Sequence, residues 1–150
     1  FFEGTDVSVG RGTEYPFEIV GKPGFSRGNF AFTPKSIPGV SKYPKHQGEK
    51  CQGFMLTDFC NEFLESYRKI YLLWLMAFYE DAENKADFFK PFFDKLAGTD
   101  ELRKQVIAGK TADQIRASWQ KDIKQFKLTR KKYLLYPDFS MQGKFIEMKR

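Results

Sequence analysis

Short apolar runs separated by glycine and proline dominate the first part of the chain. Three of them, residues 17–20, 30–32 and 53–57, have the length of β-strands and are bounded by turn-forming residues. Residues 33–50 are rich in proline, glycine and lysine, which predicts a long loop between two of these strands. Ordered loops of that length in compact domains are often functional.

Helical spacing replaces this pattern in the second part of the chain. Apolar side chains recur every three or four residues from Phe63 to Trp74, which predicts a helix over residues 61–79. We expect Trp74 to pack in the core of the protein. Apolar residues resume over 88–96, where a second helix is expected to end at Gly98.

Two further helices follow, each with recognisable end signals. Residues 100–107 are expected to form a helix that Thr99 caps and Gly109 ends. A capping-box pair that begins at Thr111 predicts a longer helix, which ends near Arg130. The predicted buried stripe of this last helix consists of Ile115, Trp119, Ile123 and Phe126.

These elements together predict the fold class. Residues 133–136 (YLLY) are interpreted as one more strand, which Pro137 ends. We therefore expect an α/β fold of the α+β-like kind, with a small mixed sheet from residues 1–60 and 133–136 packed with three to four helices from 61–131. A length of 150 residues suits a single domain.

The net charge and the cysteine content indicate which ligands and surfaces the protein could bind. The net charge of +6 favours an anionic partner, but basic residues are scattered, so we expect no nucleic-acid binding. No apolar run reaches the roughly 18 residues of a membrane span, and none is expected. Cys51 and Cys60 are interpreted as two free, buried thiols, and their spacing predicts no metal site. We expect no cofactor.

The densest cluster of glycine and polar residues is FEGTDVSVGRGT at residues 2–13. Glycine lets a ligand approach main-chain N–H groups, and Arg11 between two glycines would present a cation that suits a carboxylate or phosphate. The spacing does not fit a dinucleotide or P-loop fingerprint. The alternative is a structural turn in which Glu3 or Asp6 accepts hydrogen bonds from loop N–H groups and pairs with Arg11.

This cluster also carries a family resemblance. FEGTDVSVGRGT followed by PFEIVG resembles the DUF1343 family, whose characterised members are exo-β-N-acetylmuramidases of the NamZ type. The resemblance continues through FTPKSIPGVSKYPKHQGEKCQGFMLTD, LAGTDELRKQVIAGKTADQIRASWQKDIKQF and RKKYLLY, over nearly all of residues 2–136. Asp6 departs from the pattern, because many relatives carry asparagine there.

The resemblance implies how the chain is organised and what it does. Family members are longer and combine an N-terminal Rossmann-like domain with a C-terminal α/β domain. This chain would be the C-terminal, cleft-forming domain, without the N-terminal domain that holds the main catalytic carboxylate. The implied full-length enzyme is a glycosidase that releases terminal N-acetylmuramic acid from peptidoglycan fragments. It would be periplasmic or secreted in a bacterium, and the isolated chain would be inactive.

Candidate site residues come from the cluster and from the loop at residues 33–50. Glu3 and Asp6 are candidate catalytic carboxylates, but neither is assigned a definite role. Arg11 is expected to contact the lactyl carboxylate of muramic acid. A lone loop histidine such as His46 is usually solvated, and the functional alternative is a hydrogen bond to sugar or a proton shuttle. The predicted substrate-binding set is Glu3, Thr5, Asp6, Ser8, Gly10, Arg11, Gly12, Thr13 and His46.

Two other functions fit the same composition. One is a non-catalytic basic module that binds an anionic glycan or nucleic acid, and it predicts a contiguous positive surface. The other is an autonomous carbohydrate-binding domain that uses exposed aromatic rings. The resemblance over several blocks favours the glycosidase, because charge and aromatic content are generic properties.

Overall fold

The computed structural model describes residues 1–57, 59, 63, 67 and 69–138. A small sheet and several helices make up this part of the chain, so the predicted α/β fold class is confirmed. The chain divides into two compact units, Phe1–Ala112 and Asp113–Arg150. The single domain expected over residues 1–150 stays a prediction.

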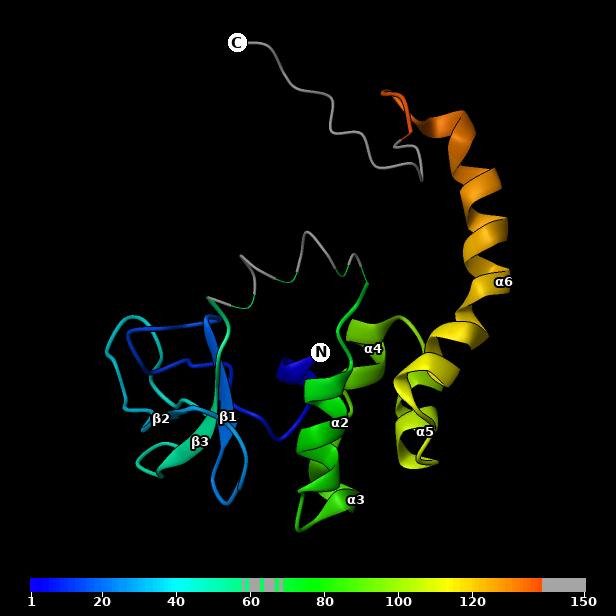
Figure 1. Ribbon diagram of the computed structural model, residues 1–150. Coiled ribbons are helices and arrows are strands. Elements are labelled where there is room, and N and C mark those ends of the chain that lie inside the picture. Colours follow the sequence, from blue (N-terminus) through cyan, green and yellow to red (C-terminus); the bar gives the residue numbers. More distant parts are fainter. Residues whose placement is uncertain (58, 60–62, 64–66, 68, 139–150) are drawn as a thin grey trace. The chain divides into compact units, whose positions relative to one another are not determined.

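Three antiparallel strands form the sheet of the first unit (Figure 1). They are β1 (Ile19–Lys22), β2 (Phe30–Phe32) and β3 (Cys51–Met55), and β3 is the central strand. Val20 pairs with Phe54 across β1 and β3, and Phe32 pairs with Cys51 across β2 and β3. A Cβ at Gly53 would lie 1.8 Å from the carbonyl oxygen of Val20, so the central strand needs glycine there.

The strands lie close to their predicted positions, with two shifts. Residues 30–32 form β2 as predicted. The run at 17–20 is displaced to β1, because Phe17 takes a left-handed φ of 68° and its N–H donates to the carbonyl of Val9, which makes it part of a turn. The run at 53–57 is displaced toward the N-terminus, to β3.

Two predicted features of the sheet are wrong. Residues 133–136 are not a strand: Lys131–Tyr133 is a 3₁₀ turn, η2, and the sheet has no fourth strand in the described part of the chain. The physical reason is local: the helical winding of α6 continues past Arg130 into this 3₁₀ turn, so Tyr133 is not extended. The sheet is also wholly antiparallel, whereas a mixed sheet was predicted.

The helices of the first unit are shorter than predicted. Those whose bounds lie in the described residues are α2 (Leu73–Glu80), α3 (Lys85–Phe88), α4 (Phe93–Ala97) and α5 (Glu101–Ile107). The predicted helix over 61–79 is not continuous, because residues 69–72 are not helical and α2 begins at Leu73. Part of that predicted helix, at positions 61, 62, 64–66 and 68, lies outside the described residues.

The predicted helix over 88–96 is divided at Phe89. This residue has an extended backbone and forms an isolated antiparallel bridge with Thr5, which ends α3 before α4 begins. A long-range contact thus overrides a helical pattern, as tertiary contacts often do.

The ends of the last two helices agree with the prediction, but of the stripe predicted to be buried in the last helix, Ile115 is buried whereas Ile123 and Phe126 are exposed. The hydroxyl of Thr99 accepts a hydrogen bond of 3.2 Å from the N–H of Glu101 at the start of α5, and Gly109 follows the helix with a φ of 70°. The final helix, α6 (Ala112–Arg130), belongs almost wholly to the second unit. With it, the described chain has five α-helices, where three to four were expected. None of them is both long and apolar enough to cross a membrane.

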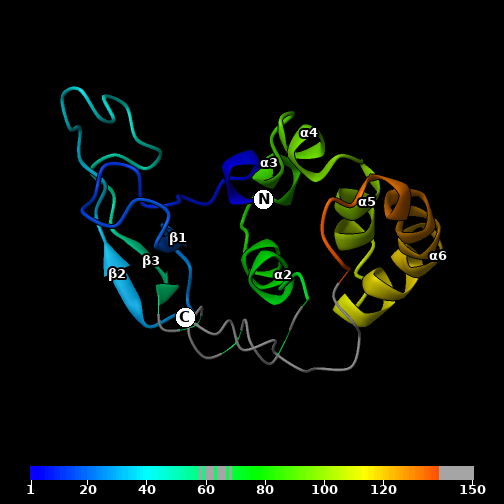
Figure 2. The same cartoon turned by 90° about the horizontal axis from the view of Figure 1, so that it is seen from above.

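The N-terminal segment joins the two halves of the first unit. The sheet lies on one side and α2–α5 lie on the other, in both views (Figures 1 and 2). The segment begins in a 3₁₀ turn, η1 (Phe2–Gly4), which packs on α4. It then bridges Phe89 through Thr5 and Gly21 of β1 through Ser8. The cluster at residues 2–13 therefore runs along the junction between helices and sheet.

Aromatic rings fill the core at this junction. Phe78 of α2 is fully buried, and its ring centroid lies 4.1 Å from that of Phe25 and 6.0 Å from that of Phe54 in β3. Trp74 stacks on Phe54 at 5.8 Å, in agreement with the predicted packing role. These contacts hold α2 against the sheet and so keep the N-terminal segment between them.

The cysteine prediction is confirmed for Cys51, which is free and buried. Burial raises the pKa of its thiol to about 12, and the nearby Glu49 and Asp6 carboxylates add to the effect. A thiol in that state is a packing residue of the sheet rather than a nucleophile. Cys60 lies outside the described residues.

Candidate functional site

The glycines of the N-terminal cluster have structural reasons to be glycine. A Cβ at Gly4 would lie 2.5 Å from the backbone of Phe93, so Gly4 lets η1 pack closely on α4. Gly10 and Gly12 have φ values of 79° and 83° and form a tight turn that most side chains would strain. Gly12 also accepts a hydrogen bond from the N–H of Lys35, which ties the turn to the loop at 33–50.

The hydroxyl groups of the cluster bind its own backbone. Thr5 donates to the carbonyl of Phe2 at 2.8 Å and accepts from the N–H of Val7. The hydroxyl of Ser8 accepts from the N–H of Gly10, and that of Thr13 donates to the carbonyl of Gly10 at 2.7 Å. Thr5 and Ser8 are buried. Both hydroxyls thus serve the local backbone, and their predicted substrate-binding role stays a prediction.

Arg11 and Glu3 form an ion pair on the surface of the turn. The guanidinium Nη2 donates to Glu3 Oε1 at 2.9 Å, and the side chains are 52% and 45% exposed. The guanidinium also lies over the ring of Phe17, 4.9 Å from its centroid. In the described part of the chain, Nε and Nη1 of Arg11 have no hydrogen-bond partner. The pair orients Arg11 but, in the described part of the chain, occupies only one of its N–H groups.

This ion pair borders a small hollow of about 110 Å³. Its lining combines Glu3 and Arg11 with Ser8, Val9 and Lys45. Two cations and one carboxylate therefore surround it, and Arg11 is the cation with open donors. The hollow has room for a small anionic group, and a guanidinium edge is well suited to a carboxylate.

Asp6 lies beside a different and larger hollow, of about 380 Å³. One of its carboxylate oxygens is 3.8 Å from the ammonium of the buried Lys22, and the other is 3.8 Å from Nε2 of His46. Asp87 and Lys90 also line this hollow. Glu3 and Asp6 thus border separate hollows, and neither hollow brings them together as a pair of carboxylates.

Two residues of the loop at 33–50 hold the backbone of the cluster. The ammonium of Lys45 donates to the carbonyl oxygens of both Thr5 and Val7, the latter at 3.0 Å. Nε2 of His46 lies 2.6 Å from the carbonyl oxygen of Asp6. A carbonyl only accepts, so Nε2 carries the hydrogen in this bond. Three successive carbonyls are therefore fixed by two adjacent side chains from elsewhere in the sequence.

This arrangement corrects the expectation for His46 and adds a residue that the sequence did not indicate. The His46 side chain is only 14% exposed and is hydrogen-bonded, so the solvated interpretation is wrong. Burial lowers the pKa of the Lys45 ammonium, and the neighbouring Asp6 carboxylate opposes the shift. Lys45 carries no local sequence signal, because its partners lie about forty residues away.

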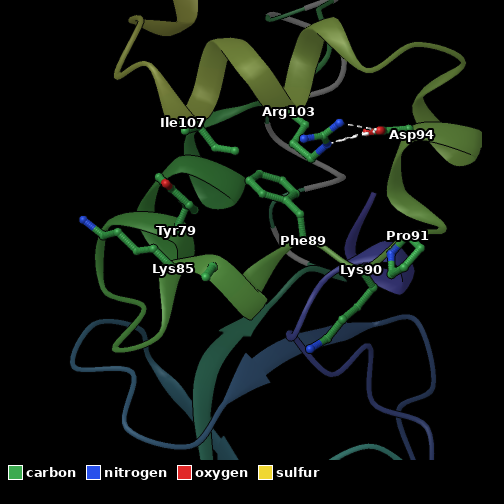
Figure 3. Close-up of a pocket in the computed structure, with 9 residues that line it drawn as sticks. Tyr79, Lys85, Phe89, Lys90, Pro91, Asp94, Arg103 and Ile107 are labelled. Carbon is green, nitrogen blue, oxygen red and sulfur yellow. Dashed lines mark hydrogen bonds and ion pairs between the residues drawn. The ribbon is translucent and has the colours of Figure 1, made fainter.

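A third hollow, also of about 380 Å³, lies among the helices (Figure 3). Tyr79 and Phe89 line it, and Arg103 makes a two-pronged bond to Asp94, with Nε 2.9 Å from one oxygen and Nη2 2.7 Å from the other. This bond lowers the pKa of Asp94. Arg103 is engaged, and the cluster at residues 2–13 contributes no residue to this hollow.

No group of three His, Cys, Asp or Glu residues in the described part of the chain is arranged to hold a metal ion. The cluster at residues 2–13 offers one oriented cation, one separate carboxylate and main-chain groups that are fixed by hydrogen bonds.

Comparisons with known proteins place these features in a family context. The family described as "Exo-beta-N-acetylmuramidase NamZ, C-terminal" matches residues 1–136. The chain is 34% identical over 145 residues to the peptidoglycan β-N-acetylmuramidase NamZ of Bacillus subtilis (strain 168), covering 89% of this chain and 35% of that protein.

A solved structure agrees with this match. The crystal structure of a DUF1343 family protein from Bacteroides fragilis NCTC 9343 is similar with a TM-score of 0.82 and 43% identity, over 92% of this chain and 38% of that one. The chain thus spans little more than a third of the length of the relatives that it matches.

Proposed function

The chain belongs to the NamZ C-terminal family of DUF1343 proteins, and from that premise we propose that it is the cleft-forming part of a longer exo-β-N-acetylmuramidase. The longer protein would release terminal N-acetylmuramic acid from peptidoglycan fragments. The observation that carries this proposal is the family match over residues 1–136, because it includes the whole N-terminal cluster.

The separation of the carboxylates supports a division of labour between two domains. Cleavage of a glycosidic bond usually needs two groups that flank the same bond, most often two carboxyl groups. Glu3 borders one hollow and is paired with Arg11, whereas Asp6 borders another. We therefore propose that the principal catalytic carboxylate comes from a preceding Rossmann-like domain, and that this chain forms the opposite wall of the cleft.

Arg11 is the residue that we propose to recognise the substrate. N-acetylmuramic acid differs from its neighbour in the glycan, N-acetylglucosamine, by a lactyl group that ends in a carboxylate. A guanidinium makes a two-pronged contact through one edge, either Nη1 with Nη2 or Nε with Nη2, and Nη2 carries two N–H groups. One N–H of Nη2 can therefore stay on Glu3 while the other, together with Nε or Nη1, contacts that group. The Phe17 ring and the Gly10–Gly12 turn limit the motion of the side chain, so little conformational entropy is lost on binding.

The proposed reaction needs no bound cofactor, since protonation and charge stabilisation by side chains are sufficient for glycoside hydrolysis. The proposed partners are a muramic-acid saccharide and the protein's own N-terminal domain, with no role for nucleic acid. The proposed site of action is the periplasm or the cell exterior, where this saccharide would be produced.

A hydrolysis assay on two proteins tests the proposal. The full-length protein and this chain alone are each given a peptidoglycan-derived disaccharide with a non-reducing N-acetylmuramic acid, and the released sugar is measured. We expect release by the full-length protein and none by the chain alone. No release by the full-length protein would reject the glycosidase function, and release by the chain alone would reject the division of labour.

A further inference from the structure

The ammonium of Lys22 and the carboxylate of Asp6 face each other without a hydrogen bond. Lys22 ends β1, its side chain is only 10% exposed, and its Nζ lies 3.8 Å from Oδ2 of Asp6. A direct charge-assisted hydrogen bond would bring these atoms to about 2.8 Å. In the described part of the chain, neither charged group makes a shorter polar contact. A buried charge is normally hydrogen-bonded as well as paired, so a group that bonds to both would stabilise this pair.

A hollow of about 380 Å³ adjoins the pair, and we call it the Asp6 hollow. Its lining residues all lie between Asp6 and Lys90 in the sequence, so its walls belong to the first unit alone. Lys22 pairs with Gln52 near the start of β3, and the chain leaves that strand at its other end, after Met55. The volume falls within the range of about 300–1,000 Å³ that small-molecule sites occupy.

A single oxygen atom can bond to both charged groups. Because Nζ of Lys22 and Oδ2 of Asp6 are 3.8 Å apart, an oxygen can lie about 2.8 Å from each of them at the same time. This oxygen must accept from the ammonium, which only donates, and donate to the carboxylate, which only accepts. A hydroxyl group does both. The geometry of the pair therefore fits a hydroxyl-bearing ligand.

The charges around the Asp6 hollow favour a neutral ligand over an ion. Lys90 adds a second ammonium to the lining. Three exposed carboxylates add negative charge, those of Glu49, Glu83 and Asp87. An anion would meet these carboxylates and Asp6, whereas a cation would meet Lys22 and Lys90, and each contact between like charges is unfavourable. The hydroxyls of a neutral sugar can instead accept from the ammonium groups and donate to the carboxylates.

We propose that the Asp6 hollow binds a neutral sugar ring, with one hydroxyl between Lys22 and Asp6. The identity of the sugar rests on the proposed function: it is N-acetylglucosamine, the neutral neighbour of N-acetylmuramic acid in the substrate. Lys45 borders the hollow beside Arg11, and the adjacent His46 borders the Asp6 hollow. One short segment thus borders a cationic hollow for the acidic sugar and a hollow of mixed charge for the neutral sugar.

Titration of the full-length protein with methyl β-N-acetylglucosaminide, followed by ligand-detected NMR, tests the proposal. The variant Lys22→Met removes the ammonium but keeps an apolar stem, and Asp6→Ala removes the carboxylate. Lys35→Met is the matched control, because Lys35 borders a separate hollow of about 460 Å³ beside β2. Urea unfolding of each variant shows whether it is folded.

We expect wild type and Lys35→Met to bind the glycoside with the same Kd. Lys22→Met and Asp6→Ala should bind it about tenfold more weakly or not at all, because each loses a hydrogen bond to a charged group. Absence of binding by wild type, as when water or another part of the polypeptide fills the hollow, would overturn the proposal. Equal binding by all four proteins, or a loss of binding in Lys35→Met, would overturn it as well.

Amide hydrogen exchange of the wild-type protein locates the sugar without any variant. A high concentration of the glycoside should slow exchange in peptides that cover residues 22–24 and 83–90, and exchange at residues 30–37 should not change. Slower exchange only outside the first two ranges would place the sugar elsewhere and reject the inference. The hydrolysis assay separates the two proposals: release of N-acetylmuramic acid without glycoside binding rejects this inference alone, and binding at the Asp6 hollow without release rejects the glycosidase function alone.

Discussion

Arg11 and Glu3 form an ion pair 2.9 Å long in which both side chains stay about half exposed. The pair is structural and accessible at the same time. An exposed ion pair of this kind contributes little to the free energy of unfolding, about 0–1 kcal/mol. A stabilising role is therefore a poor explanation for the pair of Arg11 with Glu3. Orientation of the guanidinium explains it better, because Nε and Nη1 are left open beside a hollow of about 110 Å³.

Replacing Lys45 should loosen the N-terminal cluster. The variant Lys45→Met leaves the carbonyls of Thr5 and Val7 without their ammonium donor, at a cost of about 1–3 kcal/mol. Amide hydrogen exchange in residues 5–9 of the full-length protein should therefore accelerate by about tenfold or more. Mass spectrometry of the corresponding peptides measures the change.

Lys42→Met is the matched control for this prediction. Lys42 lies in the same loop, but among the described residues its ammonium has one contact, with the ring of Tyr43, at 5.2 Å from the centroid. Exchange in residues 5–9 should be unchanged in this variant. Equal exchange in Lys45→Met and wild-type protein would show that the ammonium does not hold the cluster.

The candidate carboxylates Glu3 and Asp6 should prove dispensable as proton donors. Loss of a general acid lowers the rate by about 10²–10⁴-fold. We expect Glu3→Gln and Asp6→Asn, made separately in the full-length protein, to keep kcat for a muramic-acid saccharide within about tenfold of wild type. A loss of about a thousandfold in either variant would identify that residue as the acid and move the catalytic group into this chain.

Local signals in the sequence predicted part of this fold correctly. The capping of α5 by Thr99, the end of α5 at Gly109 and the extent of α6 all depend on neighbours within a few residues. The strand at 30–32 was also predicted correctly. Such features follow from propensity and periodicity, which a single sequence contains.

Contacts between distant residues account for what the sequence did not reveal. Phe89 leaves the helical pattern because it pairs with Thr5, which lies far from it in the sequence. The ion pair of Arg11 with Glu3 was foreseen as an alternative, since both lie in one cluster. Lys45 and His46 were not foreseen as supports of that cluster, because nothing near them in sequence indicates partners forty residues away.

The bond between Asp94 and Arg103 predicts a pH-dependent contribution to stability. Its hydrogen bond lowers the pKa of Asp94 below the ordinary value of 3.8. A carboxyl group whose pKa is lower in the folded state stabilises that state above its unfolded pKa, and the effect is lost as the pH falls through the folded pKa. Asp94→Asn should therefore lower the urea midpoint of unfolding at pH 7, and the difference from wild type should narrow below about pH 4.

The control for this prediction is Glu80→Gln, which removes an exposed pair with Arg27 of 3.4 Å. It should change the midpoint at pH 7 by less than Asp94→Asn does. A deficit in Asp94→Asn that is the same at pH 7 and pH 3 would contradict the proposed linkage to the carboxylate charge.

The role of Arg11 in recognising the lactyl carboxylate is tested most directly by comparing two substrates in the full-length protein. One is a chromogenic β-N-acetylmuramide, and the other is the same compound with its lactyl carboxylate capped as a methyl ester. Charge-assisted hydrogen bonds contribute about 1.5–3 kcal/mol, which corresponds to about a ten- to hundredfold change in kcat/KM. Arg27→Ala is the matched control, because Arg27 also pairs with a glutamate and lies over a phenylalanine ring.

In wild type and in Arg27→Ala, kcat/KM should be about ten- to hundredfold higher for the free acid than for the ester. In Arg11→Ala, kcat/KM should be the same for the two substrates. Undiminished preference for the acid in Arg11→Ala would contradict the account, because the carboxylate would then be recognised by another part of the enzyme.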